Sequence, residues 1–155
     1  MRFIFDLDHT SICASHRGAF DSAGNGCLRC WKQLSTPENI AKDKLLPLGE
    51  QWRWLLRKGA TIVVCTSRMM QAADYDMLRA HGLGWHYMLS RTDDGEPTPQ
   101  MKKRLLGTLP GGWSQVCRSS VMFDDDVNVI QYLTAHGLRV HNALTLNDWL
   151  QEPIA

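Results

Sequence analysis

Short apolar runs alternate along the chain with segments of helical period. The runs that resemble strands are rich in β-branched or aromatic residues and cover positions 3–5, 61–65, 86–89, 121–123 and 139–141. Two of them are apolar on both faces, which is typical of strands in a parallel sheet covered on both sides. The pattern therefore predicts a sheet whose two faces are both packed against other elements.

The intervening segments carry apolar residues at helical spacing. From Leu48 onward they fall at i, i+4, i+7 and i+8, and Gly59 follows as a helix stop. Two later segments repeat this arrangement before Gly82 and Gly137, and Thr145 is the predicted N-cap of the last helix. Alternating strands and helices predict an α/β fold with a doubly wound parallel sheet.

Two stretches interrupt the alternation and lack a core pattern. They cover residues 11–44, rich in Gly, Ser and Cys, and residues 91–100, with acids and two prolines. Ligands of α/β sheets bind beyond the carboxyl ends of the strands, so insertions there tend to cover a site. At 155 residues the chain fits one compact domain. We expect a single domain over 1–155, with 11–44 as a flap.

Composition narrows the class of protein. The net charge of +1 gives no basic excess of the kind that marks a dedicated nucleic-acid binder. No apolar run approaches the roughly 20 residues that span a bilayer, which argues against a membrane protein. Five cysteines lie mostly in apolar runs, and the first strand begins at Phe3, leaving no room for a signal peptide. We expect a cytoplasmic protein in a reducing environment.

The candidate chemistry lies where predicted strands end. The first strand is followed by Asp6, Asp8 and Thr10, the second by Thr66, Ser67 and Arg68, and the fourth by Asp124, Asp125 and Asp126. Adjacent carboxylates repel one another unless a cation or protons compensate them. A cluster of hard oxygen ligands suits Mg²⁺ and leaves positions for water and a phosphate oxygen. This arrangement is typical of phosphoryl transfer.

Four motifs carry a family resemblance: DLDHT, VVCTSR, a lysine within QMKKRLL, and FDDDVNVI. In this order they resemble the motifs of the haloacid dehalogenase superfamily of aspartate-nucleophile phosphatases, over residues 3–140. Finer features, such as SHR, PLG, LSR and HGLRV, resemble the phosphatase domains of polynucleotide kinase type. Those domains remove terminal phosphates from nucleic acids or nucleotides. The resemblance implies a HAD-like Rossmannoid fold with a short flap.

The mechanism expected from the residues agrees with that of the family. Asp6 would attack phosphorus and form an aspartyl phosphate, while Asp8 would act as general acid and then general base. The resemblance implies that Asp8 also gives its backbone carbonyl to Mg²⁺, that Asp6 and Asp124 give carboxylates, and that Asp125 acts through water. Asp126 is predicted to serve as a helix N-terminal acid.

Two further residues are expected to contact the phosphoryl group. Thr66 is expected to hydrogen-bond the phosphoryl oxygens at the start of a helix, where free N–H groups favour an anion. A lysine is expected to neutralise charge on the nucleophile and the phosphoryl group. The sequence does not separate Lys102 from Lys103, and we prefer Lys102.

Five residues are candidates for substrate contact: Ser67, Arg68, Arg91, His16 and Arg17. For the two arginines after the strands, a surface ion pair is an equal alternative. For His16 and Arg17 the ordinary alternative is an exposed loop residue.

Two features of the flap region stay open. Cys27 and Cys30 form a CxxC without a second zinc-ligand pair, so two unpaired thiols around Trp31 are favoured over zinc or redox chemistry. Trp31 could stack on a base. His9 replaces the glycine most often found in the first motif, and its role is unexplained.

These observations support three functions. The favoured one is a Mg²⁺-dependent phosphomonoesterase acting on nucleic-acid 3′ ends or on nucleotides, because a short flap leaves the site open. The second is a small-metabolite or nucleoside 5′-monophosphate phosphatase, and the third is a catalytically silent binding module. The chain lacks a P-loop and hence the kinase half of a repair enzyme. No obligatory protein partner is evident.

Overall fold

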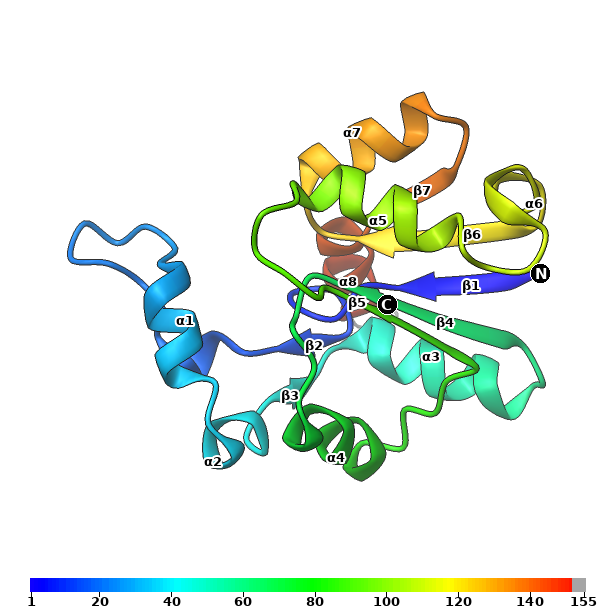
Figure 1. Ribbon diagram of the computed structural model, residues 1–155. Coiled ribbons are helices and arrows are strands. Elements are labelled where there is room, and N and C mark those ends of the chain that lie inside the picture. The colour runs from blue at the N-terminus through cyan, green and yellow to red at the C-terminus, as the bar shows by residue number, and fades with distance from the viewer. Residues whose placement is uncertain (152–155) are drawn as a thin grey trace.

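A five-stranded parallel sheet lies at the centre of the computed structural model, which describes residues 1–151 (Figure 1). Its strand order is β5-β4-β1-β6-β7. The strands are β1 (Arg2–Phe5), β4 (Thr61–Thr66), β5 (Tyr87–Ser90), β6 (Ser120–Asp124) and β7 (Arg139–Asn142). All five predicted runs are confirmed as strands of this sheet. Phe5 is in register with Val64 of β4 and Phe123 of β6, so these strands end at the same edge.

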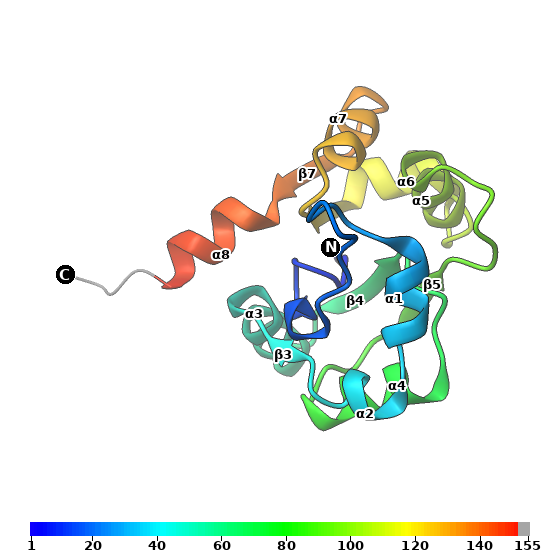
Figure 2. The same ribbon diagram turned by 90° about the vertical axis from the view of Figure 1, so that its left-hand side faces the viewer.

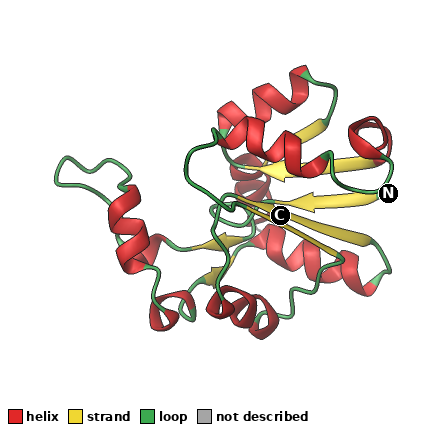
Figure 3. Cartoon of the chain, in the orientation of Figure 1, coloured by secondary structure: helices red, strands yellow, loops and turns green. Residues whose placement is uncertain are grey.

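Helices cover both faces of the sheet, as Figure 3 shows in red around the yellow strands. One face carries α3 (Pro47–Arg57) and α4 (Ala72–Ala80), and the other carries α5 (Thr98–Leu106), α6 (Gly112–Ser119) and α7 (Val127–Ala135). The last helix, α8 (Ala143–Gln151), packs against α3. The predicted α/β fold with a doubly covered parallel sheet is confirmed.

Two apolar cores result, one on each face. Side chains alternate along a strand, so Ile4 of β1 packs under α5 and α7 whereas Phe5 packs under α3. The Trp52 ring is fully buried and stacks on Phe5 with ring centroids 5.3 Å apart. Its indole Nε1 donates to the carbonyl of Gly84 at 2.7 Å. Trp52 is therefore a core residue, as its helical spacing predicts.

Helix boundaries follow the predicted stops more closely than the predicted starts. Gly59, Gly82 and Gly137 have φ of +82°, +71° and +99°, which a side chain would disfavour. The start of α8 was predicted wrongly at Thr145, since the helix begins at Ala143. The side chain of Asn142 accepts from the backbone N–H of Leu144 at 2.9 Å and so caps the helix earlier.

The flap, residues 11–44, extends beyond the edge at which the strands end (Figures 1 and 2). It contains β2 (Ile12–Cys13), the 3₁₀ turn Ser15–Arg17, α1 (Leu28–Leu34) and α2 (Pro37–Ile40). Its return strand β3 (Lys44–Leu45) pairs antiparallel with β2. The expectation that this stretch lies outside the core is wrong in part. Ile12 and Ile40 are fully buried in the α3/α4 core, which anchors both ends of the flap.

No helix among residues 1–151 is long and apolar enough to cross a membrane.

Candidate functional site

Three carboxylates meet at the carboxyl edge of the sheet. Asp6 follows β1, and Asp124 and Asp125 lie at the end of β6, its hydrogen-bonded neighbour. One oxygen from each of the three lies within 4.8 Å of the other two. Asp6 and Asp124 are buried, so this cluster lies inside the protein rather than on its surface. Neighbouring parallel strands thus bring together residues that are 118 positions apart.

A buried ammonium group lies between two of these acids. Lys102 Nζ is 2.9 Å from Asp6 Oδ1 and 2.7 Å from Asp124 Oδ2. Burial alone would lower the pKa of Lys102, but the charges of Asp6 and Asp124 raise it above its usual range, so the lysine stays charged. The Lys103 ammonium lies instead over the Trp113 ring, 5.1 Å from its centroid. Of the two candidates, only Lys102 contacts the carboxylates.

The single positive charge of Lys102 does not fully balance the negative charge of the three carboxylates. Burial, followed by the charge of Asp6, raises the pKa of Asp124 to about 6, although Lys102 opposes the shift. Burial and Asp6 likewise raise the pKa of Asp125 to about 8. Such shifts indicate a site that is short of positive charge. Hard oxygen ligands in this state fit a divalent cation such as Mg²⁺.

The backbone that presents Asp6 is held by hydrogen bonds from its own loop and from α8. Thr10 Oγ1 donates to Asp6 Oδ2 at 3.1 Å, and Ser11 Oγ donates to the Asp6 carbonyl at 2.9 Å. Asn147 Nδ2 donates to the Thr10 carbonyl at 2.9 Å, and Asn147 Oδ1 accepts from the Leu48 N–H at 2.8 Å. Sequence reasoning missed Asn147, because a polar residue on an exposed-looking helix carries no local signal of this contact.

Asp8 turns its side chain away from the carboxylate cluster toward Arg68. Arg68 Nε and Nη2 donate to the two Asp8 oxygens at 2.9 and 2.7 Å. The same guanidinium donates to Asp74 at 2.8 Å and to Asp43 at 2.9 Å. Burial would lower the pKa of Arg68, but Asp8, then Asp43 and Asp74, raise it above its usual range. Arg68 is thus buried and pairs with three carboxylates, rather than forming an ion pair at the surface.

Asp43 and Asp74 contact Arg68 at this site, and the sequence analysis did not name them. Asp74 has a local signal, because it forms a capping box with Gln71 at the start of α4. Asp43 has no such signal. It follows α2 in the chain, and both Arg17 and Arg68 donate hydrogen bonds to its carboxylate once the chain has folded.

The flap brings an aromatic ring onto this network. Arg17 is buried and donates to Asp43 Oδ1 from Nε at 3.1 Å. The guanidinium carbons of Arg17 and Arg68 lie 4.5 and 5.5 Å from the centroid of the Trp31 ring. Trp31 belongs to α1, so these contacts join the flap helix to the edge of the sheet.

A cleft of about 660 Å³ lies between the flap and the core. The flap contributes Arg17, Leu28, Trp31, Lys32 and Ser35, and the core side contributes Asp8, His9, Ser67, Arg68, Met69, Gln71, Asp74, Arg91, Asp94 and Thr98. An ion pair between Lys32 and Asp94 joins the two sides at the outer rim. The cleft therefore reaches from Asp8 to the flap helix.

The predicted role of Thr66 at a helix start is wrong in its placement. Thr66 is fully buried at the end of β4, and α4 begins only at Ala72. Its hydroxyl oxygen accepts from the backbone N–H of Arg68 at 3.0 Å. Ser67, between them, is exposed and lines the cleft.

Two other candidates make contacts within their own loops. Arg91 lines the cleft, but its guanidinium donates to the carbonyls of Asp93 and Glu96 and to the Thr98 hydroxyl, at 3.0, 2.7 and 2.8 Å. His16 is not among the residues that line the cleft, and its Nε2 lies 2.9 Å from the carbonyl of Asn39 in the flap. Substrate contact by His16 stays a prediction.

Asp126 is placed as predicted. It is the N-cap of α7, and its carboxylate accepts from the backbone N–H of Asn128 at 2.8 Å. Its own N–H donates to Asp124 Oδ1 at 3.0 Å, which helps to fix that carboxylate.

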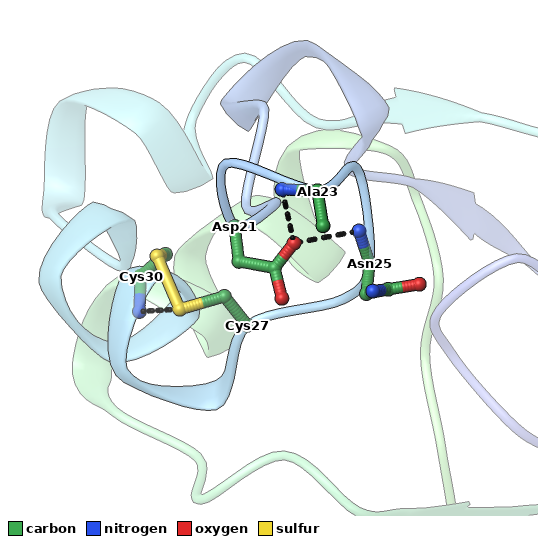
Figure 4. Close-up of a disulfide and its surroundings, with 5 residues drawn as sticks. All are labelled: Asp21, Ala23, Asn25, Cys27 and Cys30. Atoms are coloured by element: carbon green, nitrogen blue, oxygen red, sulfur yellow. Dashed lines mark hydrogen bonds between the residues drawn. A yellow bond between two sulfur atoms is a disulfide. The ribbon is translucent and has the colours of Figure 1, made fainter.

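The expectation of two unpaired thiols in the flap is wrong. Cys27 and Cys30 form a disulfide at the start of α1, where one helical turn brings their Cα atoms to 5.2 Å (Figure 4). The preceding loop is closed by Asp21, whose carboxylate accepts from the N–H groups of Ala23 and Asn25 at 2.9 Å each. The disulfide thus joins the first turn of the helix that carries Trp31.

Comparison with known proteins yields matches in both sequence and structure. A family model described as bacteriophage T5 5′-deoxynucleotidase matches residues 1–94. The 5′-deoxynucleotidase of Escherichia phage T5 is 40% identical over 84 residues, which cover 52% of this chain and 34% of that protein. The chain thus matches about a third of the length of this curated relative.

Solved structures share the fold at low sequence identity. A haloacid dehalogenase-like hydrolase from Streptococcus pneumoniae superimposes with a TM-score of 0.66 at 12% identity, covering 97% of this chain and 90% of the other. A chain of the Pnkp1/Rnl/Hen1 complex gives 0.64 at 17% identity, covering 92% and 44%. These matches confirm the haloacid dehalogenase-like fold. Together with the family model, which covers both the Asp6 and the Thr66 motifs, they show that the chain belongs to the bacteriophage T5 5′-deoxynucleotidase family.

Proposed function

We propose that this protein is a phosphomonoesterase that hydrolyses nucleoside 5′-monophosphates through an aspartyl phosphate on Asp6. The observation that carries the proposal is the Lys102 ammonium held between Asp6 and Asp124. A buried cation beside a carboxylate at the carboxyl edge of a sheet can neutralise the charge that accumulates when that carboxylate meets a phosphoryl group.

In the proposed first step a carboxylate oxygen of Asp6 attacks phosphorus, and the bond from phosphorus to the nucleoside 5′-oxygen breaks. Asp8 gives a proton to that leaving oxygen. In the second step water attacks the aspartyl phosphate, Asp8 takes up a proton from this water, and the bond from Asp6 to phosphorus breaks to release inorganic phosphate. Because Arg68 holds both oxygens of Asp8, Asp8 must turn from this pair and take up a proton from solvent before it donates.

We infer that Mg²⁺ is the cofactor. The residues that would hold it are Asp6 and Asp124 through carboxylates, Asp125 through water, and Asp8 through its backbone carbonyl. The donor set fits, since three carboxylate oxygens lie within 4.8 Å and two of the acids have raised pKa values. When bound, Mg²⁺ would supply positive charge to the phosphoryl oxygens.

Support for a nucleotide substrate comes from the family, whose description names a 5′-deoxynucleotidase. Removal of phosphate from nucleic-acid 3′ ends is the second candidate, because the SHR, PLG, LSR and HGLRV features resemble phosphatase domains of polynucleotide kinase type. We further propose that residues 1–155 act as a single catalytic domain with 11–44 as its flap, without an obligatory protein partner.

The test uses the purified full chain with Mg²⁺. We expect it to release phosphate from a 2′-deoxynucleoside 5′-monophosphate faster than from a 3′-phosphorylated oligonucleotide, and Asp6→Asn to abolish both activities. Ser22→Ala, in the exposed flap loop, is the matched control and should hydrolyse at the parental rate. Activity that persists in Asp6→Asn would overturn the nucleophile, and faster turnover of the oligonucleotide would overturn the substrate class.

A further inference from the structure

We propose that the nucleoside of the substrate binds in the cleft between flap and core, with its base held by the side chains of His9 and Trp31. The inference rests on the proposed nucleotide phosphatase function and specifies how that site would distinguish a nucleotide from other phosphate esters. Both residues line the cleft that begins at Asp8.

His9 adopts a backbone conformation that its side chain disfavours. Its φ is +59°, and it is the only residue other than glycine with positive φ among residues 1–151. A histidine here is strained where glycine would not be, which explains why glycine is usual at this place in the motif. The ring is exposed, and none of the described residues hydrogen-bonds it. Backbone strain of this kind is typical of residues at active sites and ligand-binding sites.

Trp31 lies near Asp8, the proposed general acid, with Arg68 between them. Arg68 contacts both Asp8, at 2.7 Å, and the Trp31 ring, at 5.5 Å from its centroid. One guanidinium therefore separates the proposed general acid from the indole. The Trp31 ring is half-buried and lines the same cleft as Asp8, and aromatic side chains can stack on bases.

Each side of the cleft carries one large, exposed apolar side chain. Leu28 of the flap is 61% exposed and Met69 of the core is 45% exposed, and both line the cleft. Exposed large apolar side chains that face one cavity suit a flat, largely apolar ligand.

The test compares turnover of a 2′-deoxynucleoside 5′-monophosphate with that of 2-deoxyribose 5-phosphate, which lacks the base. The measured quantity is the ratio of their kcat/KM values. We expect Trp31→Ala to lower this ratio roughly 5- to 150-fold, the range for losing one stacked base. Trp54→Ala is the matched control, because Trp54 is an exposed tryptophan on α3 outside the cleft, and it should keep the parental ratio.

A pair of variants separates the ring of His9 from its backbone. His9→Ala and His9→Gly both remove the imidazole, and both should lower the ratio to the same extent. His9→Gly also relieves the positive φ, so its Tm should exceed that of His9→Ala. If the ratio of kcat/KM values falls in His9→Gly although its Tm is the higher of the two, the decrease is not caused by unfolding.

Equilibrium binding to Asp6→Asn separates this inference from the proposed function. One outcome is that the parent hydrolyses neither substrate while calorimetry shows that Asp6→Asn binds the nucleotide. If adding Trp31→Ala to Asp6→Asn then removes this binding, the phosphatase function fails and the base site stands. If the ratio and the nucleotide affinity are unchanged by Trp31→Ala and by His9→Gly, the base site is refuted.

Discussion

At the residue scale, the site is decided by which polar side chains the fold buries. Lys102 is 2% exposed, whereas its neighbour Lys103 points to the surface side of α5, over the Trp113 ring. Adjacent residues on a helix lie about 100° apart around its axis, so Lys102 falls within the buried face of α5 while Lys103 lies one step beyond it. The apolar residues Met101 and Leu106 of α5 are buried with Lys102 and set that face.

Replacing Lys102 by Met should abolish most activity while Lys103→Met should not. Loss of the ammonium removes the compensation of Asp6 and Asp124, for which we expect a decrease in kcat of about 100-fold or more. Steady-state hydrolysis of a deoxynucleoside monophosphate measures both variants, with circular dichroism to confirm folding. Equal decreases in the two variants would contradict the assignment.

At the element scale, the last helix holds the loop after β1 that carries Asp6, the proposed nucleophile. Asn147 of α8 hydrogen-bonds the Thr10 carbonyl and the Leu48 N–H, which joins the loop after β1 to the start of α3. Both contacts are buried, so each polar group would be left without a partner if the amide were removed. The position of Asp6 therefore depends on an element that follows it by more than 130 residues.

Asn147→Ala should lower the free energy of unfolding by about 2–6 kcal/mol, because two buried groups lose their partners at roughly 1–3 kcal/mol each. Asp148→Ala, at the next and exposed position of α8, should change it by less than about 0.5 kcal/mol. Urea denaturation followed by circular dichroism gives both values. Matching midpoints for the two variants would show that Asn147 has no such role.

At the scale of the whole molecule, the carboxylate cluster links stability to pH. The pKa of Asp124 is raised to about 6 and that of Asp125 to about 8, mainly by burial and then by Asp6, with Lys102 opposing the shift at Asp124. In the unfolded chain both groups titrate near 4, so the folded state binds more protons between pH ~4 and ~8. Stability is therefore lost as the pH rises through that window.

Without a divalent cation, the Tm of the parent should fall from pH 5 to pH 8 more than that of Asp125→Asn, which cannot ionise at this position. Binding of Mg²⁺ to ionised carboxylates should raise the Tm more at pH 8 than at pH 5. Differential scanning calorimetry at both pH values, with Mg²⁺ or with a chelator, measures this. An identical Mg²⁺ effect at the two pH values would count against the cation site.

The sequence by itself determined the strands, the helix stops and the chemistry at strand ends, because these depend on local periodicity and on residue type. Five apolar runs predicted the sheet, and the carboxylates that follow β1 and β6 predicted where the acids would meet. These signals are short-range, so they can be read without knowledge of the packing. The sequence did not separate Lys102 from Lys103, which only the contacts with Asp6 and Asp124 decided.

Only the tertiary structure decided the hydrogen bonds between distant residues and the conformation of particular backbone segments. Asp43 and Asn147 reach the site through buried hydrogen bonds to Arg68 and Thr10, and no periodicity marks them. The pairing of Cys27 with Cys30 and the positive φ of His9 depend on local backbone geometry that residue spacing does not specify. Hydrogen bonds and charges need specific atoms within about 3 Å, and that proximity exists only once the flap, the sheet and α8 have packed together.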